Sequence, residues 1–190
     1  MAAFAQGEIE QDFPLLHAHA VVAIWGALET MVEDLLVAWL MNVPEALEID
    51  AVMKLRIPIA RFLSMRNEDR MRFLVAELQQ TNSGKKRGVG RYEALLGIFD
   101  LSGKIDPQVK QDLIEMHSTR NVIVHRASII DREFVDACQW LDKKQGDKIV
   151  VTHADYHRFE EATEKYVVCI MNRVLDHFSL LRYVDDSGLE

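Results

Sequence analysis

The sequence predicts an all-α protein, an antiparallel helical bundle with a long first helix and a small β insertion before the last helix. Apolar residues recur at steps of three and four in several segments, which is the period of an amphipathic helix. The chain has 4 Pro and 9 Gly among 190 residues, too few for a turn-rich all-β protein. Since a domain typically has roughly 150 residues, we expect residues 1–190 to form a single domain.

The long first helix is predicted over residues 15–43. Pro14 and Pro44 flank it, because proline is tolerated in a first helical turn and ends a helix from just beyond it. Its apolar side chains form one wide face, made of Leu15, Ala18, Val22, Trp25, Leu28, Val32, Leu35, Leu36 and Trp39. At 1.5 Å per residue this helix is about 40 Å long, so we expect it to be the spine of the bundle.

Three shorter helices and a loop are predicted to follow. Apolar spacing indicates helices at residues 58–65, 68–80 and 92–101. The segment 81–90, TNSGKKRGVG, is predicted to be a loop because it is rich in Gly and contains Asn and Ser.

Local capping signals place the last two helices. Asp106 and Pro107 have the pattern of an N-cap followed by a first-turn proline, opening a helix that continues to about residue 127. Thr152 and Asp155 resemble a capping box, and the last helix is expected to continue from there to about residue 182.

The remaining segments are predicted to be a hairpin and two flexible tails. The β-branched run KIVVT at 148–152 indicates a short strand, which we expect to pair with residues 134–141. Residues 1–11 and 184–190 are expected to be flexible.

Composition excludes several classes of protein. A net charge of −8 excludes a uniformly basic protein that coats nucleic acid. The longest apolar run, residues 20–28, is far shorter than the roughly 20 residues of a membrane-spanning helix, so we expect no membrane partner. Two cysteines without a CxxC pattern favour a reducing, cytoplasmic setting. No dinucleotide fingerprint or P-loop is recognised, and no cofactor is predicted.

Positive charge is nevertheless concentrated in one segment. Residues 54–91 hold ten basic and three acidic side chains, a local net charge of +7. One interpretation is a surface for RNA, with the loop cations as its centre: Lys85, Lys86, Arg87 and Arg91. The other is a solvated helix face followed by a flexible loop.

The most informative segment is EMHSTRNVIVHR, residues 115–126. Helical spacing places Arg120 in the middle of an apolar stripe formed by Val109, Leu113, Met116, Ile123, Ala127 and Ile130. A buried guanidinium without a partner is costly. We therefore expect Arg120 either to pair with a carboxylate, such as Glu29 or Glu33, or to line a cleft that receives an anion.

Polar residues lie beside Arg120 on the same helix. His117, Asn121 and His125 are spaced at i, i+4 and i+8 and form a ridge, which the long Arg120 side chain can reach. Together they offer a cation, an orienting amide and an imidazole that titrates near neutral pH. Metal-independent RNA cleavage needs a base for the 2′-hydroxyl and a cation for the phosphate charge.

The segment Arg-Asn-Val-Ile-Val-His, residues 120–125, resembles the R-N-x-x-x-H form of the HEPN (higher eukaryotes and prokaryotes nucleotide-binding) motif. The long first helix with WGALETMVEDLL also looks like this superfamily of small helical bundles. The resemblance implies that Arg120 and His125 are the catalytic pair and that Asn121 orients them. It also implies a homodimer whose two motifs face one cleft, and metal-free cleavage that leaves a 2′,3′-cyclic phosphate.

One position departs from the superfamily. HEPN toxins paired with minimal nucleotidyltransferase antitoxins often carry Tyr two places after the His, where this chain has Ala127. The resemblance therefore does not support silencing by nucleotidylation at that position.

We predict a metal-independent endoribonuclease of HEPN type, a toxin or defence effector in the cytoplasm. Its expected partners are RNA, a second copy of the chain and a cognate antitoxin protein, and His117 is expected to contribute to RNA binding with the loop cations. The alternative is a non-catalytic HEPN-like RNA-binding or protein-interaction module in which the same residues are structural.

Other candidates are weaker. His153 and His157 have the i, i+4 spacing of a metal site, but surface residues are the favoured interpretation. His17 and His19 point in different directions on a helix and make a poor pair. No metal site is predicted, and Cys138 and Cys169 are interpreted as packing residues.

Overall fold

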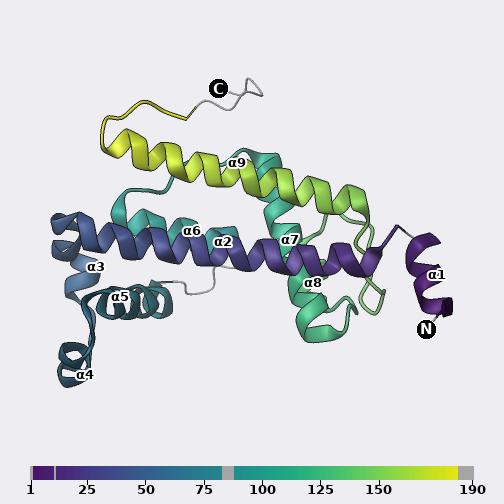
Figure 1. Cartoon of the computed structure of the whole chain (residues 1–190), viewed down its shortest axis with the longest axis horizontal. Helices are drawn as coiled ribbons and strands as arrows, with labels where there is room; N and C mark the ends of the chain where they lie inside the picture. Colours follow the sequence, from purple (N-terminus) through teal and green to yellow (C-terminus); the bar gives the residue numbers. More distant parts are fainter. Residues whose placement is uncertain (1, 11, 83–87, 184–190) are drawn as a thin grey trace. The chain divides into compact units, whose positions relative to one another are not determined.

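The computed structural model describes residues 2–10, 12–82 and 88–183 (Figure 1). Within these ranges the chain is helical and contains no strand, which confirms the all-α class. The helices are α1 (Ala2–Glu10), α2 (Pro14–Asn42), η1 (Pro44–Glu48), α3 (Asp50–Met53), α4 (Ile59–Ser64), α5 (Asn67–Asn82), α6 (Val89–Leu96), η2 (Gly97–Phe99), α7 (Pro107–Arg126), α8 (Arg132–Ala137) and α9 (His153–His177). No described helix has both the length and the apolar character that a membrane span requires.

The chain is organised in two compact units, which are described separately. The first unit comprises residues 1–28 and 105–168, and the second comprises residues 29–104 and 169–190. The helices α2 and α9 each contribute residues to both units. The single domain over residues 1–190 and the HEPN type of bundle stay predictions.

The long first helix is confirmed within one residue at each end. Pro14 is its first residue, and Pro44 begins the 3₁₀ helix that follows. Its buried side is formed by Val21, Trp25, Leu28, Val32, Leu36 and Leu40, at steps of three and four. This side differs slightly from the predicted face, because Val22 is only half-buried and Leu15 is 46% exposed.

The helix that carries the motif begins as predicted. The Asp106 carboxylate accepts hydrogen bonds from the backbone N–H groups of Gln108 and Val109, at 2.8 and 3.2 Å. Pro107 occupies the first turn, and α7 ends at Arg126. Ala127 then adopts a left-handed conformation with φ of 49°, which ends the helix.

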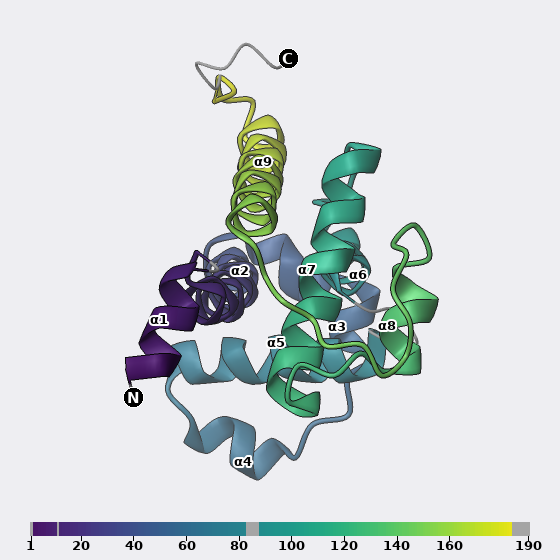
Figure 2. The same ribbon diagram turned by 90° about the vertical axis from the view of Figure 1, so that its right-hand side faces the viewer.

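The predicted β insertion before the last helix is wrong. Residues 132–137 form α8, and the segments on either side of it are joined by one isolated antiparallel bridge, between Ile129 and Lys148, and by backbone hydrogen bonds between residues 128–130 and 146–149. The Asp131 carboxylate caps α8 by accepting a hydrogen bond from the Phe134 backbone at 2.9 Å. The predicted hairpin partner is therefore a helix, and α8 packs beside the end of α7 (Figure 2).

Burial explains why this segment is helical. Phe134 of α8 and the C-cap residue Cys138, four positions later, are buried in one cluster with Val122, and the half-buried Val135 packs against it. A step of four suits one side of a helix, whereas a strand buries alternate residues. Residues 134–141, the predicted partner of 148–152, therefore do not form a strand.

The capping box of the last helix is confirmed. The Asp155 carboxylate accepts hydrogen bonds from the Thr152 hydroxyl and backbone N–H at 2.8 and 3.1 Å, and the Thr152 hydroxyl accepts one from the Asp155 backbone. The helix ends at His177, earlier than the predicted residue 182. Ser179 has a φ of 54°, and the Leu180 N–H donates to the Leu175 carbonyl at 2.9 Å, a helix-ending arrangement.

Three other segments differ from the prediction or lie outside the described residues. Residues 2–10, expected within a flexible tail, form α1. The helix expected over 92–101 begins earlier, at Val89, and gives way to the 3₁₀ helix η2 after Leu96. Most of the predicted basic loop, residues 83–87, and the C-terminal tail 184–190 lie outside the described residues.

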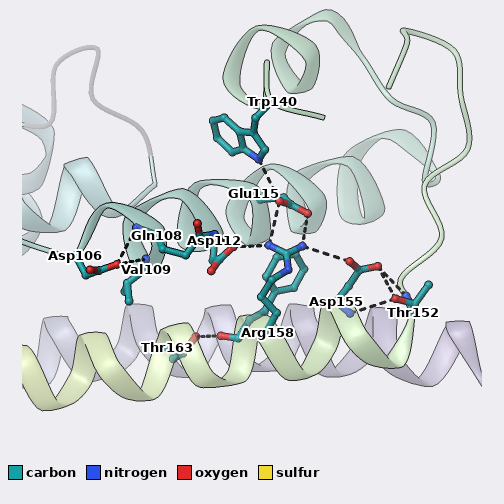
Figure 3. A network of polar contacts seen from close by, with 11 residues as sticks. Asp106, Gln108, Val109, Asp112, Glu115, Trp140, Thr152, Asp155, Arg158 and Thr163 are labelled. Carbon is teal, nitrogen blue, oxygen red and sulfur yellow. Dashed lines mark hydrogen bonds and ion pairs between the residues drawn. The ribbon is translucent and has the colours of Figure 1, made fainter. Parts of the chain in front are cut away.

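In the first unit, one arginine of α9 joins two buried carboxylates of α7. Figure 3 shows Arg158 pointing toward Asp112 and Glu115, which are only 5% and 6% exposed. Its guanidinium lies 2.5 Å from the Asp112 carboxylate and 2.6 Å from that of Glu115. Asp155 adds a third carboxylate at 3.3 Å, and the Trp140 indole donates to Glu115 at 3.3 Å.

The charges of this network depend on one another. Burial acts to lower the pKa of the Arg158 guanidinium, but hydrogen bonds to Glu115 and Asp112 outweigh this effect and raise its pKa. Both carboxylates are acceptors that need donors when buried, and Arg158 supplies donors to each. The network therefore holds α7 and α9 in one register.

A comparable arginine organises the second unit. Arg173 pairs with Glu93 at 2.8 Å and donates to the carbonyl groups of Leu101 and Lys104. Gly103 lies so close that an added Cβ would stand 2.9 Å from the Arg173 Nε atom. A side chain at position 103 is therefore excluded unless Arg173 moves.

Replacing the central arginine of the first unit is expected to destabilise the protein. Arg158→Met leaves Asp112 and Glu115 buried without their cation, and we expect it to lower the free energy of unfolding by about 2–3 kcal/mol. This is less than for a fully buried pair, because the Arg158 side chain is 34% exposed. Urea denaturation followed by circular dichroism measures the change.

The matched control is Lys165→Met on the same helix, which removes an exposed pair with Glu161. It is expected to cost no more than about 0.5 kcal/mol. Equal losses for the two variants would contradict a central role of Arg158.

Candidate functional site

The C-terminal half of α7 brings together three of the predicted site residues. The Arg120 Nη1 atom lies 3.1 Å from the Asn121 Oδ1 atom and 3.4 Å from the His125 Nε2 atom. The guanidinium therefore lies on the helix surface between the side chains of Asn121 and His125. Arg120 and Asn121 are half-buried, whereas His125 is exposed.

The donor and acceptor roles in this contact follow from chemistry. A guanidinium can only donate, so the Asn121 oxygen and the His125 Nε2 atom must accept. An accepting Nε2 carries no proton, which places the proton of a neutral His125 on Nδ1. At 3.4 Å the contact with His125 is long and weak, so an incoming group can replace it.

Asn121 also connects the site to the core of the first unit. Its amide nitrogen lies 3.2 Å from the His117 Nε2 atom. The His117 ring packs against Trp25, with ring centroids 4.8 Å apart at an angle of 53°. Because Trp25 is 2% exposed, this contact fixes the His117 ring on a buried surface, and Asn121 is held by it in turn. His117 was predicted to bind RNA. In the structure it contacts Trp25 and Asn121, and its role in RNA binding stays a prediction.

The carboxylates considered as partners of Arg120 are engaged in the second unit. Glu29 pairs with Arg91, and Glu33 accepts a hydrogen bond from the Gln79 amide at 3.2 Å. Within the described part of the first unit, only Nη1 of Arg120 makes hydrogen bonds, and neither of them goes to a carboxylate. Its Nε atom is buried without a hydrogen-bond partner among the described residues. Arg120 therefore keeps N–H groups that could donate to an anion, and the expected anion-binding cleft stays a prediction.

The predicted loop cations have different outcomes. Lys85, Lys86 and Arg87 lie outside the described residues. Arg91 is half-buried, where it pairs with Glu29 and lies over the ring of Tyr92 with its guanidinium carbon 5.4 Å from the ring centre. In this structure the charge of Arg91 is therefore balanced within its own unit.

Two features of the site were not foreseen from the sequence. The first is Trp25, interpreted correctly as a core residue but not as the support of His117. The second is exposed apolar surface next to the motif, since Val124 and Ile129 are 46% and 43% exposed. The i, i+4 spacing of Arg120 and Val124 was the available signal for the second feature, whereas nothing local indicated the first.

The two cysteines do not add a nucleophile to this site. Cys138 is 2% exposed, and burial raises its pKa to about 11. It is a packing residue of the cluster around Val122 and Phe134, as the sequence indicates. Cys169 belongs to the second unit, where its thiol lies 3.8 Å from the Lys104 carbonyl.

Comparisons with known proteins identified no relative of this chain. No protein-family model matches the chain. No significant match was found among curated proteins or among solved structures. The side chains of α7 and their contacts are therefore the basis for a functional proposal.

The contact between Arg120 and His125 predicts a tautomer. At a pH where imidazole is neutral, His125 should carry its proton on Nδ1, because the guanidinium occupies Nε2. Nitrogen-15 NMR of the ring nitrogens measures this directly. In Arg120→Met the preference should weaken, while the exposed His157 should give the same spectrum in both proteins. A predominant Nε2–H form in the unmodified protein would contradict the arrangement.

Proposed function

We propose that this protein is a metal-independent endoribonuclease of HEPN type. The observation that supports it is the convergence, near the end of α7, of an amide, an exposed imidazole and a guanidinium that has no carboxylate partner among the described residues. The R-N-x-x-x-H resemblance assigns the same three residues to catalysis. Geometry and motif thus support the same roles.

The residues match the steps of RNA transesterification. His125 Nε2 accepts the proton of a 2′-hydroxyl, the 2′-oxygen forms a bond to phosphorus, and the bond from phosphorus to the 5′-oxygen breaks. The products are a 2′,3′-cyclic phosphate and a free 5′-hydroxyl. Arg120 stabilises the charge that gathers on the phosphate oxygens, and Asn121 keeps the guanidinium beside the imidazole.

The bonding of Arg120 favours phosphate as its partner. A guanidinium has five N–H donors, and in the described part of the first unit only those on Nη1 are used. Phosphate accepts two parallel hydrogen bonds from a guanidinium, which also fixes its orientation. RNA is therefore the proposed substrate and partner.

Cleavage also needs a proton for the departing 5′-oxygen. One copy of the site offers a single exposed imidazole next to Arg120, which acts as the base. A second copy facing it would supply the acid. The exposed apolar side chains of Val124, within the motif, and Ile129, just after it, support such a homodimer. Contact between the two copies there would bury these side chains away from water.

The HEPN resemblance further supports a role as a toxin or defence effector in the cytoplasm, with a cognate antitoxin protein as a partner. Ala127 offers no hydroxyl for nucleotidylation. We therefore propose that an antitoxin restrains this protein by binding to it.

The contact of His117 with Trp25 favours one alternative, a non-catalytic interaction module. In that case Asn121 and His117 fix the packing of α7, and Arg120 and His125 complete a structural network. The two functions differ in what His125→Ala changes. A catalytic role predicts lost cleavage with unchanged stability and dimerisation. A structural role predicts a protein that does not cleave RNA and that unfolds or loses the dimer in the variant.

RNA cleavage in the presence of EDTA tests the nuclease. We expect the unmodified protein to cut single-stranded RNA and leave cyclic phosphate ends. His125→Ala and Arg120→Ala should lower kcat/KM by about 10² to 10⁴-fold. Arg132→Ala and His157→Ala are matched controls, since both side chains are exposed and lie on other helices of the first unit. They should cleave normally.

Cleavage that survives in both Arg120→Ala and His125→Ala would show that the activity comes from elsewhere. No cleavage by the unmodified protein, with unfolding or loss of the dimer in the variants, would favour the interaction module.

A charged side chain in place of Val124, the exposed apolar residue of the motif, tests the dimer. Val124→Glu should remain folded because Val124 is 46% exposed, but it should convert the dimer to a monomer and reduce cleavage. Size-exclusion chromatography with light scattering measures the mass. Leu16→Glu, at a side chain of α2 that is 64% exposed, is the control and should stay dimeric. A Val124→Glu protein that remains a fully active dimer would contradict this interface.

A further inference from the structure

Three metal-ligating side chains, none of them on α7, come together in the first unit. They are Asp12 before α2, His17 in the first turns of α2, and His153 at the start of α9. One ligand atom from each lies within 4.8 Å of the other two. We propose that Asp12, His17 and His153 bind a divalent transition-metal ion, with Zn²⁺ as the best match.

His17 supplies the strongest indication of a metal-binding role. Its Nε2 atom is buried and has no hydrogen-bond partner among the described residues. A buried polar atom without a partner is costly, and native proteins rarely leave one unsatisfied. A metal ion that accepts the lone pair of Nε2 would remove this cost. The half-buried His17 ring is held in place by Tyr156, with centroids 5.6 Å apart and planes inclined by 29°.

The other two ligands are positioned by local structure. Asp12 and Phe13 have positive φ angles of 58° and 54° in the turn between α1 and α2, and the Phe13 N–H donates to the Glu8 carbonyl. This turn brings the Asp12 carboxylate beside His17. His153 begins α9 directly after Thr152 of the capping box, and its ring centroid is 5.3 Å from that of His17.

This arrangement revises the interpretation of the histidines. The sequence indicated His153 and His157 as a weak metal pair because of their i, i+4 spacing. In the structure their ring centroids are 6.4 Å apart, and His157 is outside the group of three. The partner of His153 is His17, more than a hundred residues earlier in the chain.

The donor set selects the kind of metal. Two imidazole nitrogens and one carboxylate oxygen suit Zn²⁺, whereas Mg²⁺ and Ca²⁺ prefer oxygen ligands alone. Zn²⁺ binds such atoms at about 2.0–2.1 Å, which on a tetrahedron requires ligand atoms about 3.4 Å apart. Asp12 and His153 are exposed, so their side chains can move inward to reach that spacing. Three protein ligands leave a fourth position for water.

The site is independent of the proposed nuclease. Arg120, Asn121 and His125 are not among the three ligands, and the proposed RNA cleavage proceeds in EDTA. A bound metal would instead join the start of α2 to the start of α9. Failure of either proposal therefore leaves the other unaffected.

Metal binding to the untagged protein tests the site. Equilibrium dialysis with Zn²⁺ should show one high-affinity site per chain. Co²⁺ bound there should give the intense visible absorption of a tetrahedral complex. His17→Ala and His153→Ala should weaken binding by at least about 100-fold, because even outer-shell changes cost 10–100-fold. Zn²⁺ should also raise the melting temperature of the unmodified protein but not of His153→Ala.

His19→Ala and His157→Ala are the matched controls. Both remove an exposed histidine from one of the same helices, and both should retain the affinity of the unmodified protein. His153→Ala keeps the test valid if His17→Ala fails to fold, since His153 is exposed. The proposal is overturned if no stoichiometric ion binds, or if the control variants weaken binding as much as the ligand variants do.

Discussion

The ion-pair network of Arg158 is the constraint on which the first unit depends. Arg158 of α9 pairs with Asp112 and Glu115 of α7, which are both almost fully buried. If α7 rotated about its axis, at least one of these carboxylates would be left buried without its cation. Rotation of α7 would also carry its later turns with it. The direction in which Arg120 and His125 point is therefore decided one to four turns earlier, at residues that take no part in the proposed chemistry.

Arg158 and Arg120 show how the same side chain serves two purposes in one unit. Three carboxylates surround Arg158, and its charge is used to hold helices together. Arg120 contacts an amide and an imidazole instead, so its charge is not neutralised by the described residues of that unit. A cation with neutral neighbours can receive an anion without first breaking an ion pair, which is what phosphate chemistry needs. The proposed function rests on this difference.

Much of the helical pattern was predictable because its signals are local. Pro14 and Pro44 mark the ends of α2, Asp106 caps α7, and the Thr152–Asp155 box begins α9, each through atoms only a few residues apart. The hairpin prediction failed for the opposite reason. The run at 148–152 favours a strand by composition, but the segment expected to pair with it contains α8, and the run instead forms an isolated bridge from Lys148 to Ile129.

The sequence by itself determined the helical class and the grouping of Arg120, Asn121 and His125, because contacts within five residues on one helix follow from helical geometry. Only the tertiary structure decided which distant side chains meet: Trp25 with His117, Arg158 with Asp112, and His17 with Asp12 and His153. These meetings depend on the packing of α2, α7 and α9 against one another within the first unit. Burial and pairing across separate helices have no periodic signature in a single chain, so spacing alone could not have found them.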